Sequence, residues 1–190
     1  MKFNESFMDI TKDHWLVEAR RVPSQHCNER PEKEVISLLV LHNISLPPNH
    51  YGSDAIERFF TGCLDPEEHP FFKVIHKMEV SAHCLIRRDG EVVQFVPFNL
   101  RAWHAGQSSF AGRDKCNDYS IGIELEGTDF DSYTEHQYQA LARVTQAIQE
   151  HYPQITADRI TGHQYIAPIR KTDPGLSFNW KRFKSYCSTI

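Results

Sequence analysis

The sequence predicts an α/β fold: a single domain with a central mixed β-sheet flanked by helices. Apolar runs of strand length alternate along the chain with segments of helical spacing, a pattern typical of helices packed on a sheet. The chain has 190 residues, of which 40% are hydrophobic, so it is close to one domain in size and can bury a continuous core. No internal repeat or long linker divides it.

The first predicted strand covers residues 35–41, which read VISLLVL. This continuous apolar run ends directly before His42, so we expect a buried strand whose end presents a histidine. Residues 54–60 follow as a short predicted helix. Asp54 is expected to cap it, because a glutamate, Glu57, stands three residues later.

Two further segments predict strands in the middle of the chain. Residues 83–96 contain an Asp-Gly pair between two apolar and β-branched runs, which indicates a β-hairpin. Residues 120–127 read SIGIELEG, and their alternation places Glu124 and Glu126 on one face of a strand. The opposite face carries apolar side chains, so we expect it to contact the core.

The second half of the chain predicts two helices separated by a loop. Thr134 and Gln137 form a capping-box pattern, and apolar residues then recur at helical spacing until Pro153 ends the pattern. Glycines and prolines punctuate residues 161–177, which we expect to be rich in loops. A last short helix is predicted near residues 179–186.

Charge and composition exclude several classes of partner. The formal net charge is −4, and no block of like charges occurs, so nucleic acid is not expected to bind. No segment approaches the roughly 18 to 20 uninterrupted apolar residues that cross a bilayer, so no membrane association is expected. The opening residues lack the apolar stretch of a signal peptide, which predicts a cytoplasmic protein.

The five cysteines form an odd set without paired spacing, so we expect reduced thiols, with Cys84 and Cys116 packed in the interior. The eleven histidines are more informative, because imidazole is a common ligand of transition metals. Two histidines and a carboxylate can hold a hydrolytic zinc ion, and His42, His163 and Asp173 are the candidates. Nothing here matches H-E-x-x-H, so spacing alone favours structural histidines over this set of metal ligands.

Six separated segments resemble, in order, the blocks of the zinc amidases related to bacteriophage T7 lysozyme. They read LVLHNISLPP, SAHCLIRRDGEVVQFVPF, RAWHAG, CNDYSIGIELEGTD, TGHQYIAP and KTDPG. The chain is most similar to the cytoplasmic members that act on 1,6-anhydro-muropeptides in cell-wall recycling. The resemblance runs from about His14 to about Arg182. It implies an N-acetylmuramoyl-L-alanine amidase-like domain at residues 14–190 and a short N-terminal extension at residues 1–13.

The resemblance assigns roles to five residues. It implies one Zn²⁺ per chain, bound by His42, His163 and Asp173. It makes Glu124 the general base and Lys171 the group that stabilises the transition state. Strand alternation agrees that Glu124 points away from the apolar face but does not by itself choose between Glu124 and Glu126. For Glu126 we expect a solvated or ion-paired carboxylate.

The same resemblance implies contacts of Asn43, Trp103 and Lys115 with the sugar and peptide of the substrate. Related enzymes often have arginine where this chain has Lys115, and lysine lacks the planar fork that holds a carboxylate through two hydrogen bonds. His83 and His104 are expected to support the site or the sheet. The remaining histidines are expected on the surface or in loops: His14, His26, His50, His69, His76, His136 and His151.

The implied reaction is zinc-dependent hydrolysis of the amide bond between the lactyl group of (1,6-anhydro-)N-acetylmuramic acid and L-alanine. The substrate would be a small soluble muropeptide in peptidoglycan recycling, with consequences for β-lactamase regulation, and we expect the enzyme to be a monomer. Three alternatives remain at this point: a module that binds muropeptides without cutting them, a zinc peptidase for ordinary peptides, and a structural protein with an adventitious metal. All the implied ligands are present, which argues against pure binding.

Overall fold

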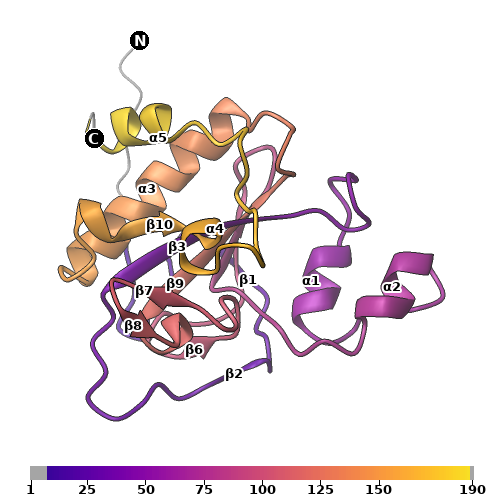
Figure 1. The fold of residues 1–190 in the computed structure, drawn as a ribbon, viewed down its shortest axis with the longest axis horizontal. Coiled ribbons are helices and arrows are strands. Elements are labelled where there is room, and N and C mark those ends of the chain that lie inside the picture. Colours follow the sequence, from indigo (N-terminus) through magenta and orange to yellow (C-terminus); the bar gives the residue numbers. More distant parts are fainter. Residues whose placement is uncertain (1–7, 189–190) are drawn as a thin grey trace.

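The computed structural model describes residues 8–188, and a six-stranded sheet lies at its centre (Figure 1). The strands are, in spatial order, β1 (Arg20–Arg21), β5 (Val92–Gln94), β4 (Cys84–Ile86), β9 (Ser120–Glu126), β3 (Leu38–Ile44) and β10 (Ile160–Gly162). β4 and β5 pair antiparallel, whereas the other neighbours pair parallel. The predicted α/β class with a mixed sheet is confirmed.

The centre of the sheet is the pair β3 and β9, which align residue by residue from Leu38 opposite Ser120 to Ile44 opposite Glu126. The predicted strand at 35–41 is therefore placed too early. Val35 is 55% exposed and precedes β3, whereas His42 lies inside the strand rather than after it. The apolar run did not reveal this end because pairing with β9 continues the strand through the polar residues His42 and Asn43.

Helix α3 (Glu135–His151) packs over one face of the sheet, and α5 (Trp180–Cys187) lies beside it (Figure 1). The predicted capping box is present: the backbone N–H of Gln137 donates to Thr134 Oγ1, and the N–H of Thr134 donates to Gln137 Oε1, both at 3.1 Å. The apolar stripe of α3 joins the apolar face of β9 in the largest core cluster. Both helices and the core-facing side of β9 were predicted.

Helices α1 (Ala55–Phe60) and α2 (Pro70–Ile75) form a separate pair at one end of the molecule (Figure 1). They pack against the strands of the hairpin through a second apolar cluster. The helix at α1 was predicted, but its cap was not correct: the Asp54 side chain makes no capping bond and instead pairs with Arg58. Ser53 Oγ accepts the Ala55 N–H at 3.3 Å in its place.

The predicted hairpin is confirmed by β4 and β5, whose turn includes Gly90 at φ +91°. The smaller elements surround the sheet: β2 (Cys27–Asn28), β6 (Arg101–Ala102), β7 (Ser109–Phe110), β8 (Arg113–Asp114), η1 (Cys116–Asp118), η2 (Ala157–Arg159) and α4 (His163–Ile166). Neither α2 nor α4 was predicted, because each is too short to show a periodic pattern.

Of the predicted N-terminal extension, residues 1–7 lie outside the described residues. Met8 packs against the main core, and Ile10 pairs with Leu16 through an isolated antiparallel bridge. Within the described range all five cysteines are free, and Cys84 and Cys116 are buried as expected. No helix in residues 8–188 is both long and apolar enough to span a bilayer.

Candidate active site

The three predicted metal ligands meet at one edge of the sheet. His42 lies near the end of β3, and His163 begins α4 directly after β10, which runs parallel to β3. Neighbouring parallel strands end at the same edge, so these two rings are brought together from distant parts of the sequence. The loop after α4 returns Asp173 to the same point. The two Nδ1 atoms and Asp173 Oδ2 lie 3.0 Å from one another in a triangle.

This donor set fits zinc. The three residues form a group whose ligand atoms lie within 4.8 Å of one another, and both imidazoles are buried. Ligands at about 2.0–2.1 Å from a tetrahedral zinc ion lie roughly 3.3 Å apart, close to the observed triangle. The Nε2 of His163 donates to the carbonyl oxygen of Ala105 at 3.1 Å, which leaves its Nδ1 lone pair directed at the triangle. Burial lowers the pKa of His42 to about 4, so this ring is neutral at pH 7, as a metal ligand must be.

Glu124 lies beside the triangle, because β9 pairs it directly with His42 on β3. Its side chain is buried, and among the described residues Oε2 has no hydrogen-bond partner. Burial raises the pKa of Glu124 well above its usual value, and the negative charge of Asp173 raises it further, whereas the positive charge of Lys171 lowers it. A carboxyl group with a raised pKa and a free oxygen can take up and release a proton.

The triangle and Glu124 line a cavity of about 370 Å³ that Lys171, Asn43 and Trp103 also line. Lys171 is otherwise exposed, and the Asn43 amide donates to Asp129 Oδ1 at 2.9 Å. The indole Nε1 of Trp103 donates to Asn28 Oδ1 at 3.0 Å, which fixes the ring at the edge of the cavity. Seven of the eight residues predicted for the site are thus brought together: His42, Asn43, Trp103, Glu124, His163, Lys171 and Asp173.

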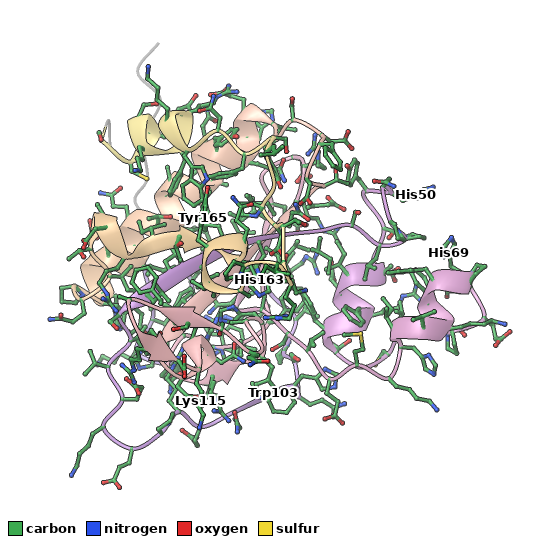
Figure 2. The ribbon with its side chains drawn as sticks, viewed as in Figure 1. His50, His69, Trp103, Lys115, His163 and Tyr165 are labelled. Carbon is green, nitrogen blue, oxygen red and sulfur yellow. The ribbon has the colours of Figure 1, made fainter. Side chains whose placement is uncertain are left out.

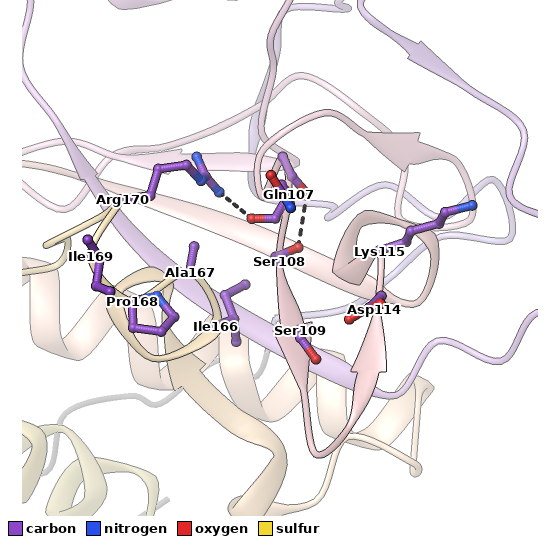
Figure 3. Close-up of a pocket in the computed structure, with 11 residues that line it drawn as sticks. Gln107, Ser108, Ser109, Asp114, Lys115, Ile166, Ala167, Pro168, Ile169 and Arg170 are labelled. Atoms are coloured by element: carbon purple, nitrogen blue, oxygen red, sulfur yellow. Dashed lines mark hydrogen bonds between the residues drawn. The ribbon is translucent and has the colours of Figure 1, made fainter.

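Lys115 is the predicted residue that the structure does not bring into this cavity. It lies at φ +59° before η1 and lines a separate surface pocket of about 650 Å³ together with Arg170 and residues 166–169. Figure 3 shows its side chain extending away from the other residues of that pocket. Arg170 connects the two regions, because its Nη2 donates to the same Ala105 carbonyl that accepts from His163.

Glu126, two residues after Glu124 on the same face of β9, is fully partnered. Its carboxylate accepts the backbone N–H of Gly52 at 2.6 Å and of Arg88 at 3.2 Å, and it pairs with Arg87 at 3.5 Å. The prediction of an ion-paired carboxylate is confirmed. It is buried rather than solvated, since its side chain is only 2% exposed.

The other histidines lie where they were expected. His104 and His83 contact the site and the sheet: His104 Nδ1 lies 2.9 Å from His42 Nε2, and His83 Nδ1 accepts the Gly122 N–H. In Figure 2, His50 and His69 lie at the outer end with α1 and α2, whereas His163 is central. His26 lies in a loop, one of the two positions predicted for it, but it is buried there: it is 8% exposed and its ring stacks on Trp103.

The sequence patterns did not reveal the apolar wall of the cavity. Side chains from α1, from α2, from the end of β3 and from nearby loops form it: Ile44, Leu46, Phe59, Phe60, Phe71, Ile75, Met78 and Val80. Aromatic residues in two short helices resemble ordinary core residues in the sequence. Phe71 and Met78 differ from core residues in their exposure, which is 37% and 49%, and only the structure reveals this difference.

Comparison with known proteins agrees with this geometry. The sequence model of the N-acetylmuramoyl-L-alanine amidase family matches residues 32–176. The protein named 1,6-anhydro-N-acetylmuramyl-L-alanine amidase AmpD from Salmonella typhimurium (strain SL1344) is 62% identical over 171 residues, which are 90% of this chain and 91% of that relative.

Two solved structures extend the comparison. The crystal structure of a selenomethionine AmpD derivative is 60% identical and superposes with a TM-score of 0.91 over 93% of this chain and 98% of that one. The amidase AmiD from E. coli, in complex with anhydro-N-acetylmuramic acid-L-Ala-D-γ-Glu-L-Lys, is 25% identical with a TM-score of 0.60 over 93% of this chain and 65% of that one. The chain belongs to the N-acetylmuramoyl-L-alanine amidase family and is an enzyme of that class.

Proposed function

We propose that this enzyme uses one zinc ion to hydrolyse the amide bond between the lactyl group of 1,6-anhydro-N-acetylmuramic acid and L-alanine. The observation that carries the proposal is the triangle of His42, His163 and Asp173 with Glu124 beside it, whose Oε2 has no hydrogen-bond partner among residues 8–188. The substrate class is supported by the names of the AmpD relatives and by the anhydromuramyl peptide bound to AmiD. We place the reaction in the cytoplasm, on soluble muropeptides released for recycling.

His42, His163 and Asp173 would hold the zinc ion. Zinc in such a site supplies Lewis acidity, which polarises a carbonyl oxygen and makes water a stronger nucleophile at neutral pH. Burial holds both imidazoles in place, so little reorganisation is needed when the substrate enters.

Glu124 moves the proton. Its carboxylate accepts a proton from the attacking water and then delivers it to the nitrogen of L-alanine, which otherwise leaves poorly. The raised pKa of Glu124 suits both steps, because a base whose pKa lies closer to the working pH can also act as an acid. Lys171 stabilises the negative charge that develops on the carbonyl oxygen.

The remaining contacts orient the substrate. Trp103 and the apolar wall offer a surface for the anhydro sugar, and the Asn43 amide also lines the cavity. Because Lys115 lines a separate pocket, we assign it to the distal end of the stem peptide, away from the reacting bond. We also propose that the enzyme is active as a monomer.

The test is mass spectrometry of 1,6-anhydro-N-acetylmuramyl tripeptide after incubation with the enzyme. The wild type should release free tripeptide, chelator should abolish release, and added zinc should restore it. Asp173→Ala should abolish both zinc retention and cleavage. The matched control is Asp158→Ala, which changes an exposed aspartate outside the ligand group and should cleave like the wild type.

A second arm compares this soluble substrate with polymeric peptidoglycan. We expect the soluble muropeptide to be cut much faster, and equal rates would contradict the recycling role. Failure of a folded, zinc-loaded wild type to cleave either substrate would contradict the proposed reaction itself.

A further inference from the structure

Whether Nδ1 of His42 can bind a metal depends on a proton at the other ring nitrogen, Nε2. A neutral imidazole carries one proton, so one of its nitrogens donates and the other accepts. His42 can bind a metal through Nδ1 only when its proton is on Nε2. The group that faces this Nε2 is Nδ1 of His104, at 2.9 Å.

A chain of hydrogen bonds determines the direction of that contact. The hydroxyl of Ser120 donates to the carbonyl oxygen of Cys116 at 2.6 Å, and a carbonyl can only accept. The Ser120 oxygen has no second proton, so it must accept from Nε2 of His104, which lies 3.1 Å away. His104 therefore has a bare Nδ1, and this nitrogen accepts the Nε2 proton of His42.

The structure builds a fixed place for His104. Its backbone N–H and that of Ala105 both donate to Asn117 Oδ1, at 3.1 Å and 2.8 Å. Its ring lies against Gly122 of β9, where an added Cβ would come within 2.4 Å of the imidazole. A glycine is required at this position of β9 because the His104 ring occupies the space that a side chain would fill.

We propose that Ser120 and His104 are positioning residues that keep the proton of His42 on Nε2 and so leave Nδ1 free for a divalent metal. The proposal rests on the proposed zinc site. In this proposal His104 accepts the Nε2 proton of His42, just as the Ala105 carbonyl accepts the Nε2 proton of His163. Two consecutive residues therefore orient the two imidazole ligands. Neither Ser120 nor His104 is expected to touch the metal.

The first test is zinc affinity, measured by competition with a chromogenic chelator. His104→Leu removes the acceptor, whereas His104→Asn places an amide oxygen near the position of Nδ1. We expect His104→Leu to weaken zinc binding about 10- to 100-fold, the usual cost of losing such a partner, and His104→Asn to restore most of it. Equal losses in both variants would overturn the proposal, because they would indicate a packing role only.

Ser120→Ala is the smaller perturbation. It removes the acceptor for His104 Nε2 while leaving both imidazoles in place, and it should weaken zinc binding several-fold. The matched control is Ser24→Ala, which removes another buried hydroxyl, one that donates to the Phe60 carbonyl. If Ser120→Ala bound zinc as tightly as the wild type, the proposed chain of hydrogen bonds from Ser120 through His104 to His42 would be contradicted. Circular dichroism and thermal unfolding confirm that each variant is folded.

The second test reads the protons directly, in long-range ¹H–¹⁵N spectra of the metal-free protein. We expect His104 to be protonated on Nε2 in the wild type and to lose that preference in Ser120→Ala. Protonation of wild-type His104 on Nδ1 would overturn the proposal. This readout needs neither zinc nor substrate, so it decides the proposal even if the proposed reaction fails.

Discussion

Glu124 and Glu126 lie two residues apart on the same face of β9, yet their surroundings are opposite. Glu126 accepts two backbone N–H groups and pairs with Arg87, so its charge is compensated on every side. Glu124 is also buried, but its Oε2 has no partner among residues 8–188, and burial raises its pKa.

The difference shows how one strand can supply a carboxylate that stabilises the fold, Glu126, and one that is suited to proton transfer, Glu124. A buried carboxylate is tolerated when hydrogen bonds and an ion pair satisfy it, as they do for Glu126. A buried carboxyl group that lacks those bonds is costly to the fold and is retained where its proton is useful. Each carboxylate also has its own cation, Arg87 for Glu126 and Lys171 for Glu124, and the predictions below separate the two regions.

The largest effect on stability is expected from Arg87. Its guanidinium pairs with Glu57 at 2.5 Å and with Glu126 at 3.5 Å, and its side chain is only 12% exposed. Arg87→Met would leave the buried Glu126 without its cation and Glu57 with Arg20 as its remaining partner, so we expect a loss of about 3–5 kcal/mol in the free energy of unfolding. Urea denaturation of the metal-free protein measures this loss. A change below about 1 kcal/mol would show that Glu126 is not held by charge pairing.

Lys171 should show the reverse behaviour. Lys171→Met removes the cation to which we assign stabilisation of the developing negative charge, and we expect hydrolysis to slow by about 10²- to 10³-fold. Its free energy of unfolding should change little, because the side chain is exposed. Steady-state kinetics and urea denaturation on the same sample test both parts. Lys181→Met on α5 is the control, since it removes an exposed lysine away from the cavity.

The pH dependence of stability should have opposite signs in the two regions. Hydrogen bonds from Arg20, followed by those from Arg87, lower the pKa of Glu57 to about 2, so its stabilising contribution is present above the ordinary glutamate pKa and is lost as the pH falls toward 2. The pKa of Glu124 is raised, so its contribution is present at low pH and is lost as the pH rises through the raised pKa.

Two variants separate these effects in the metal-free protein. Glu57→Gln should flatten the loss of stability in acid, and Glu124→Gln should flatten the loss on the neutral side. Urea denaturation across this pH range gives both profiles. The same pH profile for wild type and Glu124→Gln would show that Glu124 titrates normally.

Local patterns predicted much of the fold. The capping box of α3, the Asp-Gly turn and the alternation of β9 each lie within a short segment, and all three are present. The end of β3 was misplaced because pairing with β9, rather than an apolar run, continues that strand through His42 and Asn43. The short α2 depends on a cap by His69 Nδ1 and on Pro70, which periodicity does not detect.

The site was less accessible to sequence patterns. The trio of ligands was identified through resemblance, because the 3.0 Å triangle is created by two parallel strands and a returning loop. Alternation placed Glu124 and Glu126 on one face but did not distinguish them. The partners that do so, Gly52 and Arg87, come from distant segments of the chain.

The most direct test of this account compares Glu124→Gln with Glu126→Gln, both loaded with zinc, in the anhydromuramyl tripeptide assay. We expect Glu124→Gln to slow hydrolysis by about 10²- to 10⁴-fold while remaining folded and zinc-bound. Glu126→Gln should keep near-normal turnover per folded molecule but lose about 1–3 kcal/mol of stability. Near-normal turnover by Glu124→Gln, or a catalytic loss confined to Glu126→Gln, would contradict the assignment of Glu124 as the group that moves the proton.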